Sequence, residues 1–144
     1  LIHDDVYDLF YQHPEQPFLH SHTYTGHALG VAAACATLDM MQADDINARA
    51  VLLGQEMKAR FQAVADDTGR LENIRSIGGL VAGDLITPDD ATNWGRKLAH
   101  EALKRGALLR PLDKTVYWMP PLTMDTTTLD ALAEITCDAI NMLD

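Results

Sequence analysis

The sequence predicts a two-layer α+β domain, in which a small, mostly antiparallel sheet carries helices on one face. The chain has 144 residues, of which 47% are apolar, enough for one domain with a hydrophobic core. Its apolar residues recur first with helical and then with alternating spacing. The resulting order is helix, helix, strand, strand, helix, strand, strand, helix, without internal repeats or low-complexity tracts. This order predicts the two-layer arrangement.

The first 43 residues predict helices that need a partner surface. Residues 1–19 are rich in aromatic side chains, with a short helical turn expected near Asp5–Tyr11, and such a segment drapes over a core supplied by something else. Residues 26–42 form a second helix, apolar almost all round in its first half. A helix of this kind is expected to be buried.

The next helix, residues 46–65, has a clear apolar face. Asp44 and Asp45 are expected to cap its start, and Asp67-Thr68-Gly69 to end it. Apolar side chains follow one another at steps of three and four residues, which predicts a core face: Ile46, Ala50, Leu53, Met57, Phe61 and Val64.

Residues 74–86 change to the alternating spacing of strands, with Val81, Gly83 and Leu85 on one face. Gly78-Gly79 interrupts them and predicts a tight turn or a bulge. This glycine pair lacks the further glycines and the lysine of a phosphate-binding P-loop.

Thr87-Pro88-Asp89-Asp90 then predicts the start of a helix over residues 91–105, which Gly106 ends. Its inward side chains are Trp94, Leu98 and Ala102.

Two short strands, residues 108–111 and 115–119, are expected around the turn 112–114, and Pro120-Pro121 ends the second. Thr126-Thr127-Thr128 is expected to cap a final helix. One face of that helix is predicted to join the core: Leu129, Leu132, Thr136, Ile140 and Leu143.

Charge and composition exclude several classes of function. The net charge of −10 disfavours binding to nucleic acids and to anionic membranes. No apolar run is long enough to span a membrane, and residues 1–5 lack the features of a signal peptide. The chain does not begin with Met, so a fragment is expected. Cys35 and Cys137 lie in apolar helical patterns, which predicts buried free thiols and a cytoplasmic protein.

The segment from His20 to His27 is the first candidate site. Hydroxyls and free backbone N–H groups before a helix of small residues suit a phosphate group. Alternatively, Thr23 or Thr25 only caps that helix, with Gly26 relieving the turn. The histidines could also suggest a metal, but no Cys or carboxylate stands nearby to complete a tetrahedral site, so no metal is expected.

Residues 108–121 form the second candidate site. Arg110 follows two leucines, and a guanidinium in apolar surroundings needs a partner. That partner is either the carboxylate of a ligand, held by two hydrogen bonds, or an acidic side chain of the protein itself. Tyr117 and Trp118 point to opposite faces of their strand, so one can line a pocket while the other packs in the core.

Together the two segments resemble the class III, fold-type-I aminotransferases that use pyridoxal phosphate. Thr23-Tyr24-Thr25-Gly26-His27 is similar to the family's Thr-aromatic-x-Gly-Asn/His motif, although many members have Asn where His27 stands. Arg110-Pro111 with Tyr117-x-Met119-Pro120-Pro121 is similar to the more specific signature of the family's diaminopelargonate branch. The resemblance covers the whole chain but only the C-terminal third of the family's length.

The resemblance implies a role for each motif in a homodimeric enzyme. Thr23 would bind the cofactor phosphate of the neighbouring subunit, and His22 beside it would shape the loop. Arg110 would pair with the carboxylate of an oxo-acid substrate, and Tyr117 would line the same pocket. In this branch the reaction moves an amino group to 8-amino-7-oxononanoate in biotin biosynthesis, usually from S-adenosylmethionine and alternatively from lysine.

No residue of this chain is expected to be catalytic. The reaction needs a lysine that binds the cofactor covalently, but the lysines here have the sequence context of surface residues: Lys58, Lys97, Lys104 and Lys114. Residues 1–25 are then expected to be an arm and phosphate-site loop, the remnant of the large domain and dimer interface, and residues 26–144 the C-terminal small domain. Two alternatives stay open, namely another class III transaminase acting on ω-amino acids and a non-enzymatic acidic interaction module.

Overall fold

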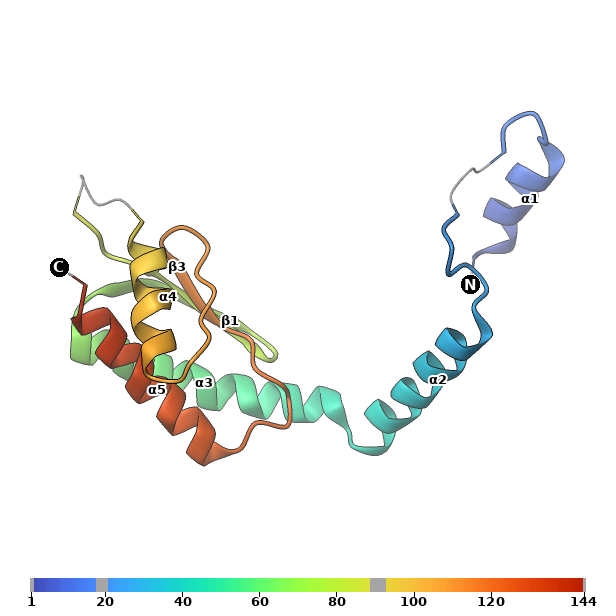
Figure 1. The fold of residues 1–144 in the computed structure, drawn as a ribbon. Coiled ribbons are helices and arrows are strands. Elements are labelled where there is room, and N and C mark those ends of the chain that lie inside the picture. The colour runs from blue at the N-terminus through green and yellow to red at the C-terminus, as the bar shows by residue number, and fades with distance from the viewer. Residues whose placement is uncertain (1, 18–20, 89–92, 144) are drawn as a thin grey trace. The chain divides into compact units, whose positions relative to one another are not determined.

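The computed structural model describes residues 2–17, 21–88 and 93–143 (Figure 1). The predicted roles of Phe18, His20 and the helix start at residues 89–91 lie outside the described residues. Within them the chain forms five helices and three strands: α1 (Asp4–Gln12), α2 (Ala28–Ala43), α3 (Ile46–Thr68), β1 (Leu71–Ile77), β2 (Leu80–Leu85), α4 (Trp94–Lys104), β3 (Thr115–Trp118) and α5 (Thr126–Asn141).

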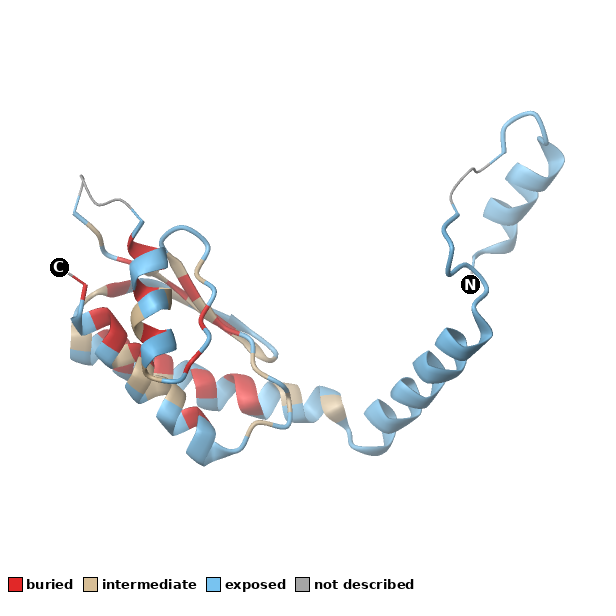
Figure 2. Ribbon diagram, in the orientation of Figure 1, coloured by how far each residue is buried: buried red, intermediate tan, exposed pale blue. Residues whose placement is uncertain are grey.

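The chain divides into two compact units, residues 1–40 and residues 41–144. Figure 2 shows that the buried residues belong to the second unit, whereas every described residue from Ile2 to Asp45 is exposed. The second unit is the predicted α+β domain, with its helices and a three-stranded antiparallel sheet around one core.

Helix α3 forms as its sequence predicts. The side chain of Asp45 accepts a hydrogen bond from the backbone N of Ala48, at 3.4 Å, and so caps the first turn. Gly69, with a φ of 61°, ends the helix in the left-handed conformation that glycine adopts without strain. The predicted core face is confirmed in the middle of the helix, where these side chains are buried: Leu53, Met57, Phe61 and Val64.

The sheet has the order β1-β2-β3, and both pairs of neighbours are antiparallel. Gly78, with a φ of 47°, lies in the turn that joins β1 to β2, so the glycine pair forms a turn rather than a bulge. The irregular register lies instead between Glu72 and Arg75, where Asn73 has a φ of 53°. Alternate residues of β2 are buried as predicted.

The expected strand over residues 108–111 is absent from the described residues, which was a wrong prediction. Pro111 has no N–H to donate to a sheet. The chain closes instead into a turn, in which Leu112 and Thr115 exchange backbone hydrogen bonds of 2.9 and 2.8 Å. Buried and exposed residues alternate from Ala107 to Arg110, but alternate burial alone does not place a segment in a sheet.

The core is centred on two aromatic rings. Phe61 of α3 meets Trp118 of β3 edge to face, with 4.9 Å between ring centroids. The indole N–H of Trp118 donates to the hydroxyl of Thr136 at 3.2 Å, and that hydroxyl donates to the carbonyl of Leu132 at 2.7 Å. Thr136 is therefore a buried but fully satisfied polar residue on α5. Asp125, rather than a threonine, caps this helix by accepting from Thr128 N at 2.7 Å.

The expected burial of residues 26–42 was also wrong, because α2 has no buried residue. Composition shows that a helix needs an apolar partner, but it does not show that the same chain supplies one. Cys35 on this helix is exposed, contrary to the prediction, and Cys137 on α5 is half-buried. Burial, together with the nearby carboxylates of Asp67 and Asp138, raises the pKa of the Cys137 thiol, which disfavours the thiolate form.

A carboxylate in β2 ties the three strands together. Asp84 pairs with the guanidinium of Arg75 through two contacts of 3.1 Å, accepts from the hydroxyl of Thr115 at 2.7 Å and contacts the amide of Asn73. The side chain of Asp84 is only 15% exposed. The bonds from Arg75 and then Thr115 hold the pKa of this carboxyl below its ordinary value.

We expect Asp84→Asn to lower the free energy of unfolding by about 1–2 kcal/mol at pH 7. Because the folded-state pKa is depressed, the stabilisation is complete above the unfolded-state pKa and is lost as the pH falls through the folded-state value. Urea unfolding of both proteins between pH 7 and pH 2 measures this. The difference should shrink steadily in acid, whereas Asp138→Asn, at an exposed residue of α5, should cost little at any pH. A difference that stays constant down to pH 2 would contradict this role of Asp84.

Candidate functional site

Arg110 lies in the segment that leads from α4 to β3. Gly106, with a φ of 99°, turns the chain away from α4. In the residues that follow, Ala107 and Leu109 are buried, whereas Leu108 and Arg110 are exposed. The buried residues hold the segment against the core, and this fixes the side from which the Arg110 guanidinium leaves the backbone.

Tyr117 reaches the same region from the middle of β3. Val116 and Trp118 on either side of it are buried, and Tyr117 itself is half-buried. The strand period predicted that the two residues point to opposite faces and left open which of them joins the core; in the structure Trp118 is the buried one. Arg110 and Tyr117 both line one pocket, which has a volume of about 600 Å³.

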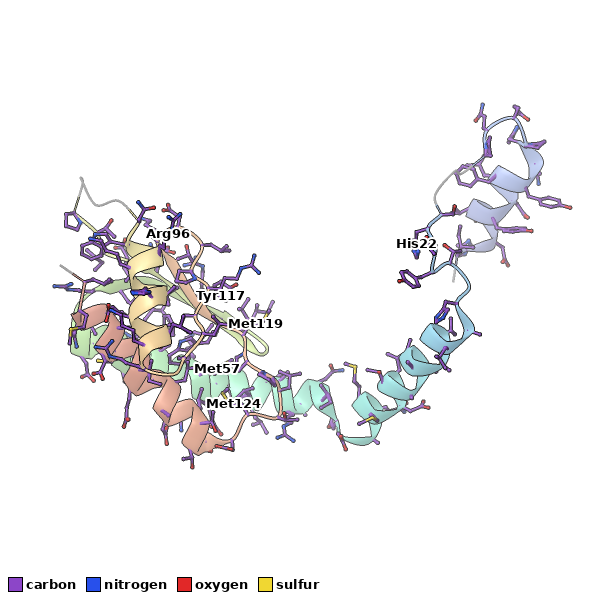
Figure 3. The ribbon with its side chains drawn as sticks, viewed as in Figure 1. His22, Met57, Arg96, Tyr117, Met119 and Met124 are labelled. Atoms are coloured by element: carbon purple, nitrogen blue, oxygen red, sulfur yellow. The ribbon has the colours of Figure 1, made fainter. Side chains whose placement is uncertain are left out.

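The rest of this pocket, which we call the Arg110–Tyr117 pocket, is mainly apolar. Leu108 and Met119 line it beside the two predicted residues, Met124 lines it from the segment before α5, and Ile135 lines it from α5. Figure 3 labels Tyr117, Met119 and Met124. The contribution of Met124 and of α5 was missed by sequence reasoning. These residues are distant from Arg110 in the chain, and the apolar stripe of α5 gave no sign beyond that of core packing.

The charge of Arg110 is available to a ligand. Across the described residues, Arg110 forms no ion pair and no side-chain hydrogen bond, so the predicted alternative of an internal salt bridge has no support there. A guanidinium beside an apolar pocket suits a ligand that has a carboxylate at one end and an apolar body.

The loop before α2 is a compact turn. Thr25 N donates to the carbonyl of His22 at 2.9 Å, and His22 N donates to the hydroxyl of Thr25 at 3.1 Å. Gly26, with a φ of 71°, lets the chain enter the helix. The imidazole Nδ1 of His27 accepts from Gly30 N at 3.0 Å and caps the helix. The alternative that Thr23 or Thr25 caps it is therefore wrong.

Thr23 keeps its hydrogen-bonding capacity free. Within the described part of the chain, neither its hydroxyl nor its backbone N–H has a partner, and the residue is exposed. A free hydroxyl beside a free amide has the chemistry that a phosphate oxygen needs. His22 is exposed and helps to close the turn through its backbone. Thr23 and Arg110 lie in different units, so we describe the two candidate sites separately.

The remaining candidate residues have simpler surroundings. The lysines are exposed as predicted: Lys58, Lys97, Lys104 and Lys114. Lys104 pairs with Glu101 at 2.6 Å. The described residues contain no cluster of three His, Cys, Asp or Glu side chains that could hold a metal ion. None of their helices is long and apolar enough to cross a membrane.

Comparison with known proteins gives a consistent result. The family model described as aminotransferase class-III matches residues 1–140. The adenosylmethionine-8-amino-7-oxononanoate aminotransferase of Helicobacter pylori is 33% identical over 126 residues, which are 84% of this chain and 29% of that protein. An omega-aminotransferase of Caulobacter vibrioides is 27% identical over 96% of this chain and 32% of its own length. The chain thus spans about 30% of the length of these relatives.

Solved structures show the same fold. A transaminase with L-alanine matches 98% of this chain and 35% of its own, with a TM-score of 0.82 at 22% identity. An amine transaminase from an uncultivated Pseudomonas species, in its PLP-bound form, matches 88% of this chain and 30% of its own, with a TM-score of 0.78 at 26% identity.

Proposed function

The chain belongs to the class-III aminotransferase family, and on this basis we propose that it forms the C-terminal part of a pyridoxal-phosphate-dependent transaminase. In this proposal residues 26–144 are the small domain, and residues 1–25 are an arm that reaches the cofactor site and dimer interface. The pocket that contains both Arg110 and Tyr117 is the observation that carries the proposal. Arg110 and Tyr117 belong to one sequence motif, and both line this pocket although six residues separate them in the chain.

Arg110 would bind the carboxylate of the amino acceptor. Its guanidinium offers two parallel N–H groups to the two carboxylate oxygens, and no acidic side chain of the described residues forms an ion pair with it. The apolar lining from Leu108, Met119 and Met124 would cover the hydrocarbon part of the same molecule. Tyr117 would border it with a ring that is apolar on its face and polar at its hydroxyl.

Thr23 would hold the phosphate of the cofactor in a homodimer, across the interface to the neighbouring subunit. Its free hydroxyl and N–H fit a phosphate oxygen, and the turn closed by His22, Thr25 and Gly26 fixes their directions. Pyridoxal phosphate, when bound, supplies the electron sink that makes amino transfer possible. The covalent lysine would come from outside residues 1–144, since the four lysines of this chain are all exposed.

We propose 8-amino-7-oxononanoate as the acceptor and S-adenosylmethionine as the amino donor, which would place the reaction in biotin biosynthesis. Support comes from the names of the relatives that reach 33% and 31% identity. The acceptor has the features that the Arg110–Tyr117 pocket suits, namely a terminal carboxylate on an apolar chain.

Another class III transaminase acting on ω-amino acids is the second candidate. It is favoured by the omega-aminotransferase relative at 27% identity. In that case Arg110 would still bind a carboxylate, but one on a shorter acceptor.

Amino-acceptor assays on the full-length enzyme that carries this chain separate the two candidates. With S-adenosylmethionine or lysine as donor, we expect kcat/KM for 8-amino-7-oxononanoate to exceed that for pyruvate. A strong preference for pyruvate would contradict the proposed acceptor and favour the second candidate. An enzyme that transfers no amino group to either acceptor, although it binds the cofactor, would contradict both.

A further inference from the structure

A second pocket borders Arg110 on the side of α4. It has a volume of about 330 Å³, and its lining includes Asn93 and Arg96 at the start of α4, Arg110, and Asp113 in the turn before β3. This volume lies near the lower end of the range of about 300–1,000 Å³ found for small-molecule pockets. We call it the Arg96–Arg110 pocket, and its size suits a ligand of only a few non-hydrogen atoms.

Two walls of this pocket lie close together because Gly95 has no side chain. A Cβ atom at Gly95 would overlap the backbone carbonyl oxygen of Asp113 and would lie 3.0 Å from the Cβ of Pro111. The first turn of α4 therefore packs directly on Pro111 and on the backbone of Asp113. Arg96 follows Gly95 and Arg110 precedes Pro111, so this contact brings both guanidinium-bearing residues to one pocket.

The two arginines differ from the other arginines of the chain. Each of the others has a partner within the protein: Arg60 with Glu56 and Asp130, Arg75 with Asp84, Arg105 with Glu101, Arg49 with the carbonyl of Leu122, and Arg70 with the carbonyl of Leu143. Among the described residues, neither Arg96 nor Arg110 has an ion pair or a side-chain hydrogen bond. In a chain with 21 acidic residues and a net charge of −10, both unpaired guanidinium groups line the same pocket.

Asp113 is the carboxylate that lines this pocket among the described residues, and it pairs with neither arginine. The described lining therefore has two positive charges and one negative charge. Two guanidinium groups beside one cavity repel each other, and an anion between them removes that repulsion. Each guanidinium also offers a planar pair of N–H donors that matches a phosphate or carboxylate group.

We propose that Arg96 and Arg110 together bind a small, doubly charged oxyanion in this pocket. A phosphate group and a short dicarboxylate both have this chemistry, namely two negative charges carried by oxygen atoms. The site shares Arg110 with the Arg110–Tyr117 pocket but differs from the proposed acceptor site in requiring Arg96 and a ligand with a second negative charge. It does not depend on transaminase activity, because its test measures ligand binding directly.

Nuclear magnetic resonance titrations of the ¹⁵N-labelled full-length enzyme that carries this chain, at constant ionic strength, test this site. Inorganic phosphate, malonate and acetate are added in separate experiments, and the amide shifts of Asn93, Gly95 and Arg96 are followed. We expect saturable shifts with phosphate, malonate or both, and binding of acetate at least about tenfold weaker, because acetate has one charge. The comparison of phosphate with malonate identifies the ligand chemistry.

Three variants distinguish binding of the anion by Arg96 and Arg110 from its general attraction to positive charge. Arg96→Gln and Arg110→Gln should each weaken binding at least about tenfold. Lys97→Gln removes a positive charge from the next position of α4, outside the pocket, and should leave binding within about twofold. An unchanged amide spectrum elsewhere in each variant shows that the fold is intact. Shifts that do not saturate, equal binding of acetate, or equal losses in Arg96→Gln and Lys97→Gln would overturn the proposal.

Discussion

Replacing Arg110 with alanine in the full-length enzyme is expected to lower kcat/KM for the amino acceptor about 100- to 1,000-fold. The lost interaction is a pair of charge-assisted hydrogen bonds to the acceptor carboxylate, in a pocket whose other walls are mainly apolar. The loss should appear largely as a raised KM for the acceptor, because the carboxylate is bound in the ground state as well as in the transition state. Steady-state kinetics with each substrate varied in turn measure it.

Two controls give the Arg110 result its meaning. Lys114→Ala removes an exposed positive charge four residues away and should leave kcat/KM within about threefold. An acceptor with a carboxamide in place of the carboxylate should be used poorly by the unmodified enzyme, but about as well as the acid by Arg110→Ala. If Arg110→Ala still prefers the acid as strongly as the unmodified enzyme does, Arg110 does not bind the carboxylate.

Phe61→Ala is expected to lower the free energy of unfolding by about 3–5 kcal/mol, the largest effect on stability that we predict. The Phe61 side chain is fully buried, with its ring against Trp118. A Cβ at Gly83 would lie 2.8 Å from Cε1 of the Phe61 ring, so the ring rests directly on the backbone of β2. Removing it leaves a cavity between α3 and the sheet, because two strands and a helix must move to close the gap.

Urea unfolding followed by circular dichroism measures this difference. Phe61→Leu keeps most of the volume and should cost less than about 1.5 kcal/mol. Met142→Ala removes a side chain from a residue that is 57% exposed and should change stability by at most about 0.5 kcal/mol. A loss below about 1 kcal/mol in Phe61→Ala would show that the core is not centred on this ring.

The elements that sequence reasoning predicted well are those with a periodic apolar face inside the second unit. The stripe of α3 through Met57 and Phe61, and the face of α5 through Leu129 and Ile140, form the core as expected. Periodicity works there because the partner surfaces belong to the same unit. It failed for α2, whose apolar side chains include Leu29 and Val31, because no periodicity shows which surface a helix will meet.

The candidate site was predictable in part. Arg110 and Tyr117 were found from a short motif, and the structure brings them to one pocket. The contribution of Ile135 was not predictable, since a pocket wall on α5 has the same apolar pattern as a core face. The strand expected over residues 108–111 failed for a local reason, namely that Pro111 cannot donate a hydrogen bond to a sheet. No sequence pattern indicated a role for Arg96, because its place beside Arg110 depends on the close approach of Gly95 to Pro111 and Asp113.

The measurement that tests our central claim most directly asks whether this chain carries the lysine that binds pyridoxal phosphate. The chain is incubated with pyridoxal phosphate and reduced with borohydride, and the modified residues are mapped by mass spectrometry. Since all four lysines are exposed on the surface, we expect only weak, scattered labelling, and in the full-length enzyme stoichiometric labelling of one lysine outside residues 1–144. Stoichiometric labelling of Lys58, Lys97, Lys104 or Lys114 would contradict the claim that this chain contributes binding groups and not the catalytic lysine.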